Sequence, residues 1–322
     1  MAMKSDLPGT VDESTNRPVK SSRLRELASG VIVLLVVVAV IVTVSRNREA
    51  FSTSLHEIGF GGMALSLVFG VAAVAGTYLQ WRAVLIGLDV HFGLLEGAKV
   101  FFVSQLGKYV PGSVWPVVMQ MDAGRRRGAN KKTIIAANLI TVVLSIVVGV
   151  TLAGALLPFA YPAALQRFWW ALAALPLLAV LAHPKAIPFL LDRLLRVLHR
   201  APLGVQMTNR ATGQAMMWSI VTWVFFGLHL TVLAAAVGEP SAGLLALCIG
   251  GMGLAVSAGV LFLPSPAGAG MREVVLGYVL GAVLSTGQVL AVVVASRVLL
   301  ILVDLLLAGA FAAIRRPAAA RR

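Results

Sequence analysis

Charge and cysteine are both scarce in this chain of 322 residues. Only 12% of the residues are charged and 59% are hydrophobic, a balance typical of proteins that lie within a membrane. The single cysteine, Cys248, lies inside an apolar run, which excludes an intrachain disulfide and a cysteine-based metal site. The five histidines show no ligand spacing with one another, and the sequence contains no phosphate-binding Gly-x-x-x-x-Gly-Lys-Ser/Thr pattern. We therefore expect no metal, no cofactor and no ATP hydrolysis by this chain.

Acidic residues are few as well, because 13 Asp and Glu stand against 27 Lys and Arg, for a net charge of +14. In a soluble protein this excess would suggest nucleic acid, but here the basic residues gather at the ends of apolar runs. The basic clusters lie within residues 4–25, 125–132, 185–210 and 315–322. This distribution is the positive-inside pattern. It predicts a multi-pass plasma-membrane protein with both termini in the cytoplasm and no nucleic-acid partner.

Several apolar runs approach the roughly 20 residues that a helix needs to cross the hydrocarbon core of a bilayer. They do not alternate apolar with polar residues, which excludes a transmembrane β-barrel. The predicted fold class is therefore all-α, a polytopic helical membrane protein. The predicted spans are residues 27–45, 62–80, 134–157, 168–183, 214–237, 243–263 and 288–313.

The predicted domain organisation is simple. Residues 1–22 are polar, contain Pro and Gly, and indicate a disordered cytoplasmic tail. A single transmembrane domain follows over residues 23–316, and residues 317–322 form a basic tail. Within this domain, leucines and arginines between residues 186 and 200 recur with helical period, which predicts an amphipathic helix on the cytoplasmic surface.

Two segments rich in proline and glycine, residues 107–115 and 264–273, interrupt apolar runs that are too short to cross a membrane as straight helices. We call them the first and the second break. At the first break, residues 94–106 would extend about 20 Å as a helix and residues 113–121 about 14 Å, against about 30 Å of hydrocarbon. We therefore expect a re-entrant hairpin over residues 93–122. The second break predicts a broken segment over residues 264–284, and about eight crossings in all keep the basic loops on one side.

Each break adjoins a cation, Lys108 at the first and Arg272 at the second. Opened backbone exposes N–H groups, and a short helix that begins there points its positive end at the same place. The combination predicts a site for phosphate or carboxylate. Glu273 would then orient Arg272 or carry a coupling proton. The alternative is that both cations extend to the cytoplasmic surface and the glycines only allow close packing. The coincidence of break and charge at two places favours the anion site.

Four further charged residues lie within the predicted membrane segments. Glu96 and Lys99 are three residues apart, and we expect them to neutralise each other on one helix face. Arg297 and Asp304 are two turns apart on one face, too far for a direct bond. We expect each of them to find its partner on a neighbouring helix.

Small and uncharged polar residues predict contacts between helices. Asn138, Thr141 and Ser145 form a polar stripe on one helix face, and we expect them to hydrogen-bond to neighbouring helices. Gly277 and Gly281 form a Gly-x-x-x-Gly pattern, which predicts close helix packing.

The residues around both breaks resemble the lysylphosphatidylglycerol synthase transmembrane-region family, also described as flippase-like or UPF0104. The resemblance rests on Ser104-Gln-Leu-Gly-Lys-Tyr-Val-Pro-Gly-Ser-Val-Trp115 and Leu263-Pro-Ser-Pro-Ala-Gly-Ala-Gly-Met-Arg-Glu273. It implies a membrane domain that moves a phospholipid between leaflets. The substrate-binding residues implied are Lys108, Tyr109, Pro111, Gly112, Trp115, Arg272 and Glu273. The supporting residues are Gln105, Pro264, Pro266, Gly268, Gly270, Arg297 and Asp304.

This sequence departs from the bifunctional synthases of that family, because no soluble segment follows the last predicted span. We therefore do not carry lysylation over, and the lipid headgroup stays open between a phospholipid and a polyprenyl phosphate. The leading prediction is a lipid transporter without catalytic residues, whose partners are membrane lipids. The alternative is a glycosyltransferase-like enzyme, or an accessory subunit, acting on polyprenyl-phosphate-linked glycolipids. A homo-oligomer and a partnership with a lipid-modifying enzyme both stay open.

Overall fold

A computed structural model of the chain describes residues 42, 45–109, 115–176, 189, 193, 196, 207–262 and 268–314. Every regular element within these residues is a helix. The elements are α2 (Arg48–Gly87), α3 (Leu94–Gln105), η1 (Leu106–Tyr109), α4 (Trp115–Arg125), α5 (Lys131–Leu156), η2 (Leu157–Phe159), α6 (Ala164–Phe168), η3 (Trp169–Ala174), α9 (Asn209–Val237), α10 (Ala242–Leu261), α11 (Met271–Leu280) and α12 (Thr286–Ala313). The two predicted tails, nearly all of the predicted span 27–45 and most of the predicted amphipathic helix lie outside the described residues.

Five of these helices are long and apolar enough to cross a membrane: α2, α5 with η2, α9, α10 and α12. They overlap five of the predicted spans, so the prediction of an all-helical, multi-pass membrane protein is confirmed. The predicted span 168–183 is different. Its described part, residues 168–176, contains the end of α6 and the 3-10 helix η3 instead of one continuous α-helix.

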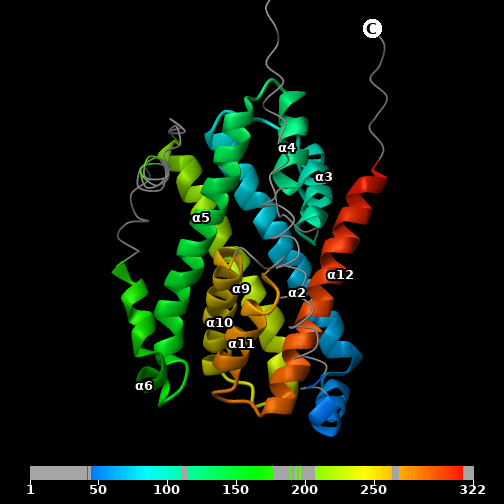
Figure 1. The fold of residues 1–322 in the computed structure, drawn as a ribbon, viewed down its shortest axis with the longest axis vertical. Coiled ribbons are helices and arrows are strands. Elements are labelled where there is room, and N and C mark those ends of the chain that lie inside the picture. Colours follow the sequence, from blue (N-terminus) through cyan, green and yellow to red (C-terminus); the bar gives the residue numbers. More distant parts are fainter. Residues whose placement is uncertain are drawn as a thin grey trace, which may run out of the picture.

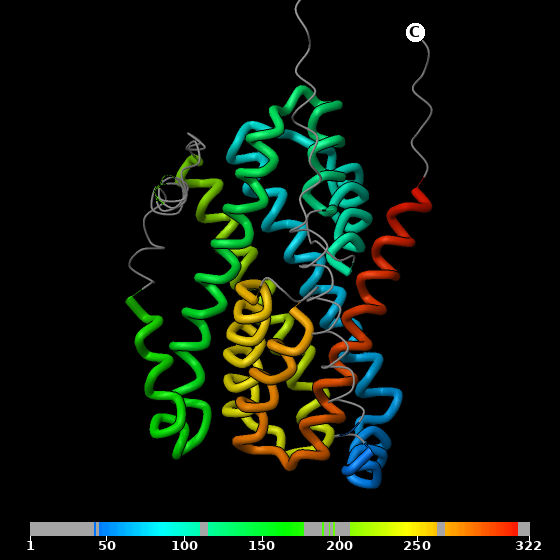
Figure 2. The backbone as a smooth tube through the Cα atoms, viewed as in Figure 1, coloured from blue at the N-terminus to red at the C-terminus, as the bar shows by residue number. Residues whose placement is uncertain are grey.

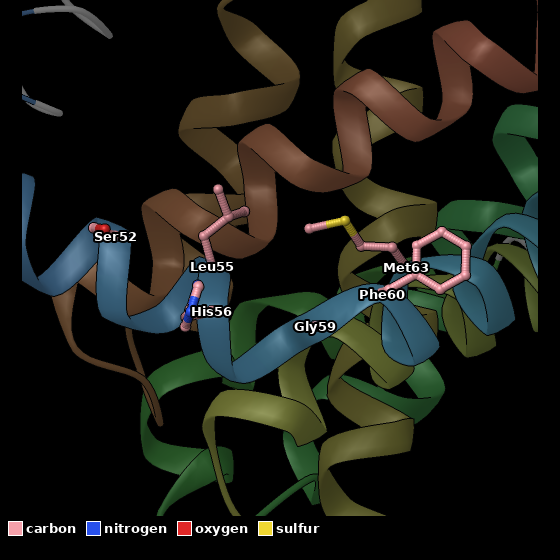
Figure 3. Close-up of a pocket in the computed structure, with 6 residues that line it drawn as sticks. All are labelled: Ser52, Leu55, His56, Gly59, Phe60 and Met63. Atoms are coloured by element: carbon pink, nitrogen blue, oxygen red, sulfur yellow. The ribbon is translucent and has the colours of Figure 1, made fainter.

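Helix α2 is longer than the predicted span 62–80, because it extends over 40 residues. The helical backbone is interrupted at Gly59, where φ is 58° and ψ is 175°, a conformation that glycine adopts readily because it lacks a Cβ. Figure 3 shows the bend in the ribbon at this glycine. An open pocket of about 530 Å³ lies at the bend and is lined by Ser52, Leu55, His56, Gly59, Phe60 and Met63.

Helix α5 packs on α9 and α10 through small residues. A Cβ placed on Gly253 of α10 would lie 2.4 Å from the carbonyl oxygen of Gly149, and one on Gly149 would lie 2.9 Å from the Trp223 ring of α9. The Trp223 indole also donates to the carbonyl of Ser145 over 3.1 Å. The predicted contact of Ser145 with a neighbouring helix is therefore present, although it uses the backbone and not the hydroxyl.

Buried aromatic rings hold α3 against α2 and α12. The ring of Tyr78 lies 5.7 Å from Phe101 and 5.5 Å from Phe102, and Phe102 in turn lies 5.0 Å from Phe311 at the end of α12. The Tyr78 hydroxyl donates to the carbonyl of Leu94 over 2.6 Å, which satisfies the polar tip of a buried ring. These contacts fix the position of the segment that carries the first break.

Two helical hairpins approach the middle of the bundle from opposite ends (Figure 1). Helices α3 and α4 lie toward the end where α12 finishes, and α10 and α11 lie toward the end where α12 begins. Figure 2 shows that α10 ends and α11 starts part-way along the bundle. Helix α12 contacts α3 and η1 from the first hairpin as well as α11 from the second. It therefore connects the two breaks that were apparent in the sequence.

Candidate functional site

The turn at the first break depends on a glycine. Gly107 is buried, and a Cβ there would lie 2.8 Å from the Cβ of Trp115 and 3.0 Å from the Cδ of Pro116. Such distances are shorter than van der Waals contact, so only glycine lets η1 approach the start of α4 this closely. The next two residues, Lys108 and Tyr109, end η1.

A buried polar network fixes both limbs of this hairpin to α5. The Gln120 amide of α4 donates to the Ser104 hydroxyl of α3 over 2.9 Å and accepts from the Asn138 amide of α5 over 2.8 Å. The carbonyl of Thr141 accepts from the Gln80 amide of α2 over 3.2 Å. The predicted bonds from Asn138 to neighbouring helices are confirmed, whereas Thr141 contributes its carbonyl and bonds its hydroxyl within its own helix.

Asp304 of α12 accepts two donors from η1. Its Oδ2 lies 2.7 Å from Nζ of Lys108 and accepts a hydrogen bond from the Tyr109 hydroxyl over 2.5 Å. The Asp304 side chain is only 4% exposed, whereas the Lys108 side chain is 34% exposed. The second carboxylate oxygen, Oδ1, is buried and has no hydrogen-bond partner among the described residues. The prediction that Asp304 pairs with a neighbouring element is confirmed.

The second break is built from backbone geometry. Gly268 has φ of +69° and Gly270 has φ of +88°, both in the left-handed region that L side chains rarely adopt. A Cβ on Gly268 would lie 2.9 Å from the Cα of Gly259, so the loop passes directly against α10. The N–H of Gly270 donates to Oε2 of Glu273 over 2.6 Å, which caps the start of α11.

The two arginines near the second break are held differently. Nε of Arg297 lies 3.7 Å from Oε1 of Glu273, which confirms the prediction that Arg297 pairs with a neighbouring helix. Arg272, in the first turn of α11, makes a weak contact of 3.7 Å with the Met252 sulfur. Its side chain is partly buried, and within the described part of the chain it forms no ion pair at bonding distance. Arg272 therefore has guanidinium donors that no carboxylate of the described residues accepts.

These side chains form one charge cluster, which we define as Lys108, Tyr109, Arg272, Glu273, Arg297 and Asp304. Tyr109 from the first break lies within electrostatic range of Arg272 and Arg297, and Arg272 lies within range of Asp304. The cluster contains three cations and two carboxylates, so it carries one net positive charge. The structure thus brings residues of both predicted breaks together on the face of α12.

A buried histidine, His229, lies beside this cluster and was not predicted as a site residue. Nδ1 of His229 in α9 lies 2.8 Å from the hydroxyl of Ser66 in α2, and Nε2 lies 2.9 Å from the hydroxyl of Ser296 in α12. Ser296 directly precedes Arg297, and His229 lies within electrostatic range of Arg272. A lone histidine in an apolar run was the available signal. Serines from two distant helices complete its environment, which local spacing does not reveal.

The predicted pairing of Glu96 with Lys99 is wrong. Glu96 forms its ion pair with Arg127 beyond the hairpin, and Lys99 donates to the carbonyls of Ala312 and Ile314 at the end of α12, each over 2.9 Å. A better acceptor set explains the difference, since the last carbonyls of a helix have no intrahelical donor.

The predicted packing role of Gly277 is also wrong. A Cβ on Gly277 would meet no atom within 4 Å, and one on Gly281 would approach only the Gly277 carbonyl oxygen of the preceding turn. Gly277 lies on a face of α11 without neighbouring atoms, whereas Leu276, Val279 and Leu280 form the buried face of this helix.

The other predicted site residues occupy less central places. Trp115 begins α4 and is 50% exposed, and Gln105 ends α3 and is partly buried. Gly268 and Gly270 shape the backbone, while four predicted prolines and glycines lie outside the described residues: Pro111, Gly112, Pro264 and Pro266. Among the described residues, no group of three His, Cys, Asp or Glu side chains is placed to hold a metal ion.

Comparison with known proteins relates this chain to a family. The family model described as Lysylphosphatidylglycerol synthase TM region matches residues 27–308 of this chain. The match includes all six residues of the charge cluster and the buried histidine. No curated protein matches the chain.

Proposed function

The chain belongs to the lysylphosphatidylglycerol synthase TM region family, and from that premise we propose that it is a lipid transporter. In this proposal the charge cluster binds the anionic headgroup of a phospholipid or a polyprenyl phosphate. The acyl or prenyl chains stay in the bilayer while the headgroup moves past α12 between the leaflets. The protein would then act on membrane lipids without catalysing a covalent reaction.

The observation that carries this proposal is the state of two of the three cations in the charge cluster. Arg272 has no carboxylate at bonding distance among the described residues, and Lys108 is one-third exposed although it pairs with Asp304. Charged groups within a membrane domain are costly unless they are paired or have a function. The start of α11 adds the positive end of a helix dipole beside Arg272. A phosphate at this place would receive charge-assisted hydrogen bonds from Arg272 and Lys108.

The transmembrane arrangement that fits this proposal has about eight crossings, a re-entrant hairpin formed by α3 and α4, and both termini in the cytoplasm. Its support is that the two hairpins approach the middle of α12 from opposite ends (Figure 1). The basic residues Arg125, Arg126 and Arg127 lie where α4 ends. That end of the bundle would face the cytoplasm of a plasma-membrane protein according to the positive-inside rule.

A reconstituted transport assay tests this function. Purified protein is placed in liposomes with a fluorescent phosphatidylglycerol in one set and a labelled polyprenyl phosphate in another, and the change of leaflet is followed by chemical quenching. We expect Arg272→Gln and Lys108→Gln each to slow transport about tenfold to a hundredfold, since each removes a charge-assisted hydrogen bond.

Arg126→Gln is the matched control, because Arg126 is exposed and pairs with an exposed Asp122 on the surface. It should transport at the wild-type rate. If the wild-type protein moves neither lipid, the transporter proposal is wrong. If it instead transfers a sugar from an added donor to a polyprenyl phosphate, the glycosyltransferase-like alternative replaces it.

A further inference from the structure

The carboxylate of Asp304 has an unusual environment for a buried charge. Oδ2 receives both donors, Lys108 and Tyr109, whereas Oδ1 is buried without any partner among the described residues. A buried carboxylate normally has both oxygens hydrogen-bonded, because an unsatisfied buried acceptor costs free energy. Oδ1 is therefore an open position for a proton.

We propose that Asp304 is a proton-binding site and that one proton is taken up when the anionic headgroup binds. This inference rests on the proposed lipid site. The lipid phosphate takes the ammonium of Lys108 as a donor, and Asp304 loses the one cation that lies at bonding distance among the described residues. Oδ1 then accepts a proton from hydronium or buffer acid in the solvent, and the carboxylate becomes a neutral carboxylic acid. The lysine keeps its own proton throughout, so the charges balance.

Two physical arguments support this exchange. First, removing the cation from a buried ion pair leaves an uncompensated charge, and protonation is the least costly way to neutralise a carboxylate there. Second, a headgroup with one negative charge and one proton together leave the net charge of the cluster unchanged. Lys108 can reach a ligand because it is 34% exposed, whereas Asp304 at 4% cannot follow it into the solvent.

The other titratable and charged groups near Asp304 have different tasks. Glu273 of α11 caps its own helix and pairs with Arg297 of α12. His229 of α9 is hydrogen-bonded through both ring nitrogens, to Ser66 of α2 and Ser296 of α12. Lys99 of α3 bonds the last carbonyls of α12. Arg272 is the nearby group with donors left for the ligand. Within the described residues, Asp304 is therefore the carboxylate with a free buried oxygen.

Calorimetry on the detergent-solubilised full chain tests the proposal, with short-chain phosphatidylglycerol as the probe. The binding enthalpy is measured in two buffers of different ionisation enthalpy, and the difference gives the number of protons taken up. We expect about one proton per lipid, and affinity that falls about tenfold for each unit of rising pH over the range where the proton is exchanged. We expect Asp304→Asn to bind the probe with no proton uptake and with the same affinity at low and high pH.

A second variant, Lys108→Gln, tests the proposal independently if Asp304→Asn does not fold. In Lys108→Gln, Asp304 has no cation to lose and already carries its proton, so the weaker binding that remains should also occur without proton uptake. Asp122→Asn, at an exposed carboxylate, should behave as the wild type does. Binding by the wild type without proton uptake, or uptake that persists in Asp304→Asn, would overturn the inference. A wild-type protein that moves no lipid in liposomes would instead overturn the proposed function.

Discussion

Each of the two breaks forms the tip of a helical hairpin that contacts α12, but different interactions stabilise the two tips. At the first break, the hairpin of α3 and α4 is held by side chains, since Gln120 links Ser104 to Asn138 and the ion pair with Asp304 anchors the tip. At the second break, the loop is held by backbone geometry, through two glycines with positive φ and direct contact with Gly259. Side-chain hydrogen bonds and an ion pair therefore hold the limbs and the tip of the first break, in addition to the close contact at Gly107, whereas glycines with positive φ set the path of the second.

The largest loss of stability is expected from a substitution at Gly268 in the second break. We expect Gly268→Ala to cost about 4 kcal/mol of folding free energy, because a left-handed backbone strains an L residue and the new Cβ overlaps the Cα of Gly259. Thermal unfolding in detergent would measure the loss. Gly277→Ala is the matched control on the same hairpin, where a Cβ meets nothing. Equal melting temperatures for the two variants would contradict the backbone explanation.

The second largest loss of stability is expected when the positive charge of Lys108 is removed from the first break. Lys108→Met takes the cation away from the buried Asp304, which must then bind a proton to become neutral in the fold, and we expect a loss of about 2–3 kcal/mol, reduced because Lys108 is partly exposed. Adding Asp304→Asn in the same chain removes the need for that proton, and we expect it to restore most of the stability. A double-mutant cycle in urea or by thermal unfolding measures this coupling. Additive losses would show that the two side chains are independent.

The polar network between the limbs provides a smaller test. Gln120→Leu removes one donor and one acceptor and leaves Ser104 and Asn138 with hydrogen bonds only to backbone carbonyls of their own helices, so we expect a loss of about 1–2 kcal/mol. Hydrogen exchange measured by mass spectrometry should report faster exchange in α3 and α4 than in α10 and α11. Uniform change over both hairpins would argue against separate stabilisation of the two breaks.

The smallest effect is expected at Lys99. Lys99→Met removes donors from the last carbonyls of α12, and we expect about 0.5 kcal/mol of destabilisation, since this contact lies at the surface. Lys99→Arg retains a cation with several donors and should recover the melting temperature. Loss of stability in the arginine variant as well would show that the exact length of the lysine side chain matters.

Much of the fold was predictable because the thickness of the bilayer sets the length of each apolar span, and this length can be read from a short stretch of sequence. Apolar runs of about 20 residues indicate spans without knowledge of their neighbours, and five of the predicted spans overlap helices of spanning length. The helical bend at Gly59 was not predictable, because no proline lies near it and glycines also occur inside unbent helices such as α10. The pairing of Glu96 and Lys99 was wrong since both residues have better partners on distant elements.

Most residues of the candidate site could be predicted from the sequence, but their pairing partners could not. Lys108 and Arg272 were recognisable because a cation beside opened backbone is rare within apolar sequence. Arg297 and Asp304 were expected to find partners on other helices, but the identity of those partners depends on how α11, α12 and η1 meet. His229 was missed for the same reason, since its two serines lie 163 and 67 residues away.

Membrane character, helical class and the two places where helices must break could all be predicted from the amino-acid sequence. These features follow from hydrophobicity, proline and glycine, which act over a few residues. Helix packing, in contrast, is what makes the two breaks meet on α12, lets Glu273 cap α11 while pairing with Arg297, and leaves one buried oxygen of Asp304 without a partner among the described residues. Those outcomes depend on which helices pack side by side, a choice made by the sum of many weak contacts across the whole bundle.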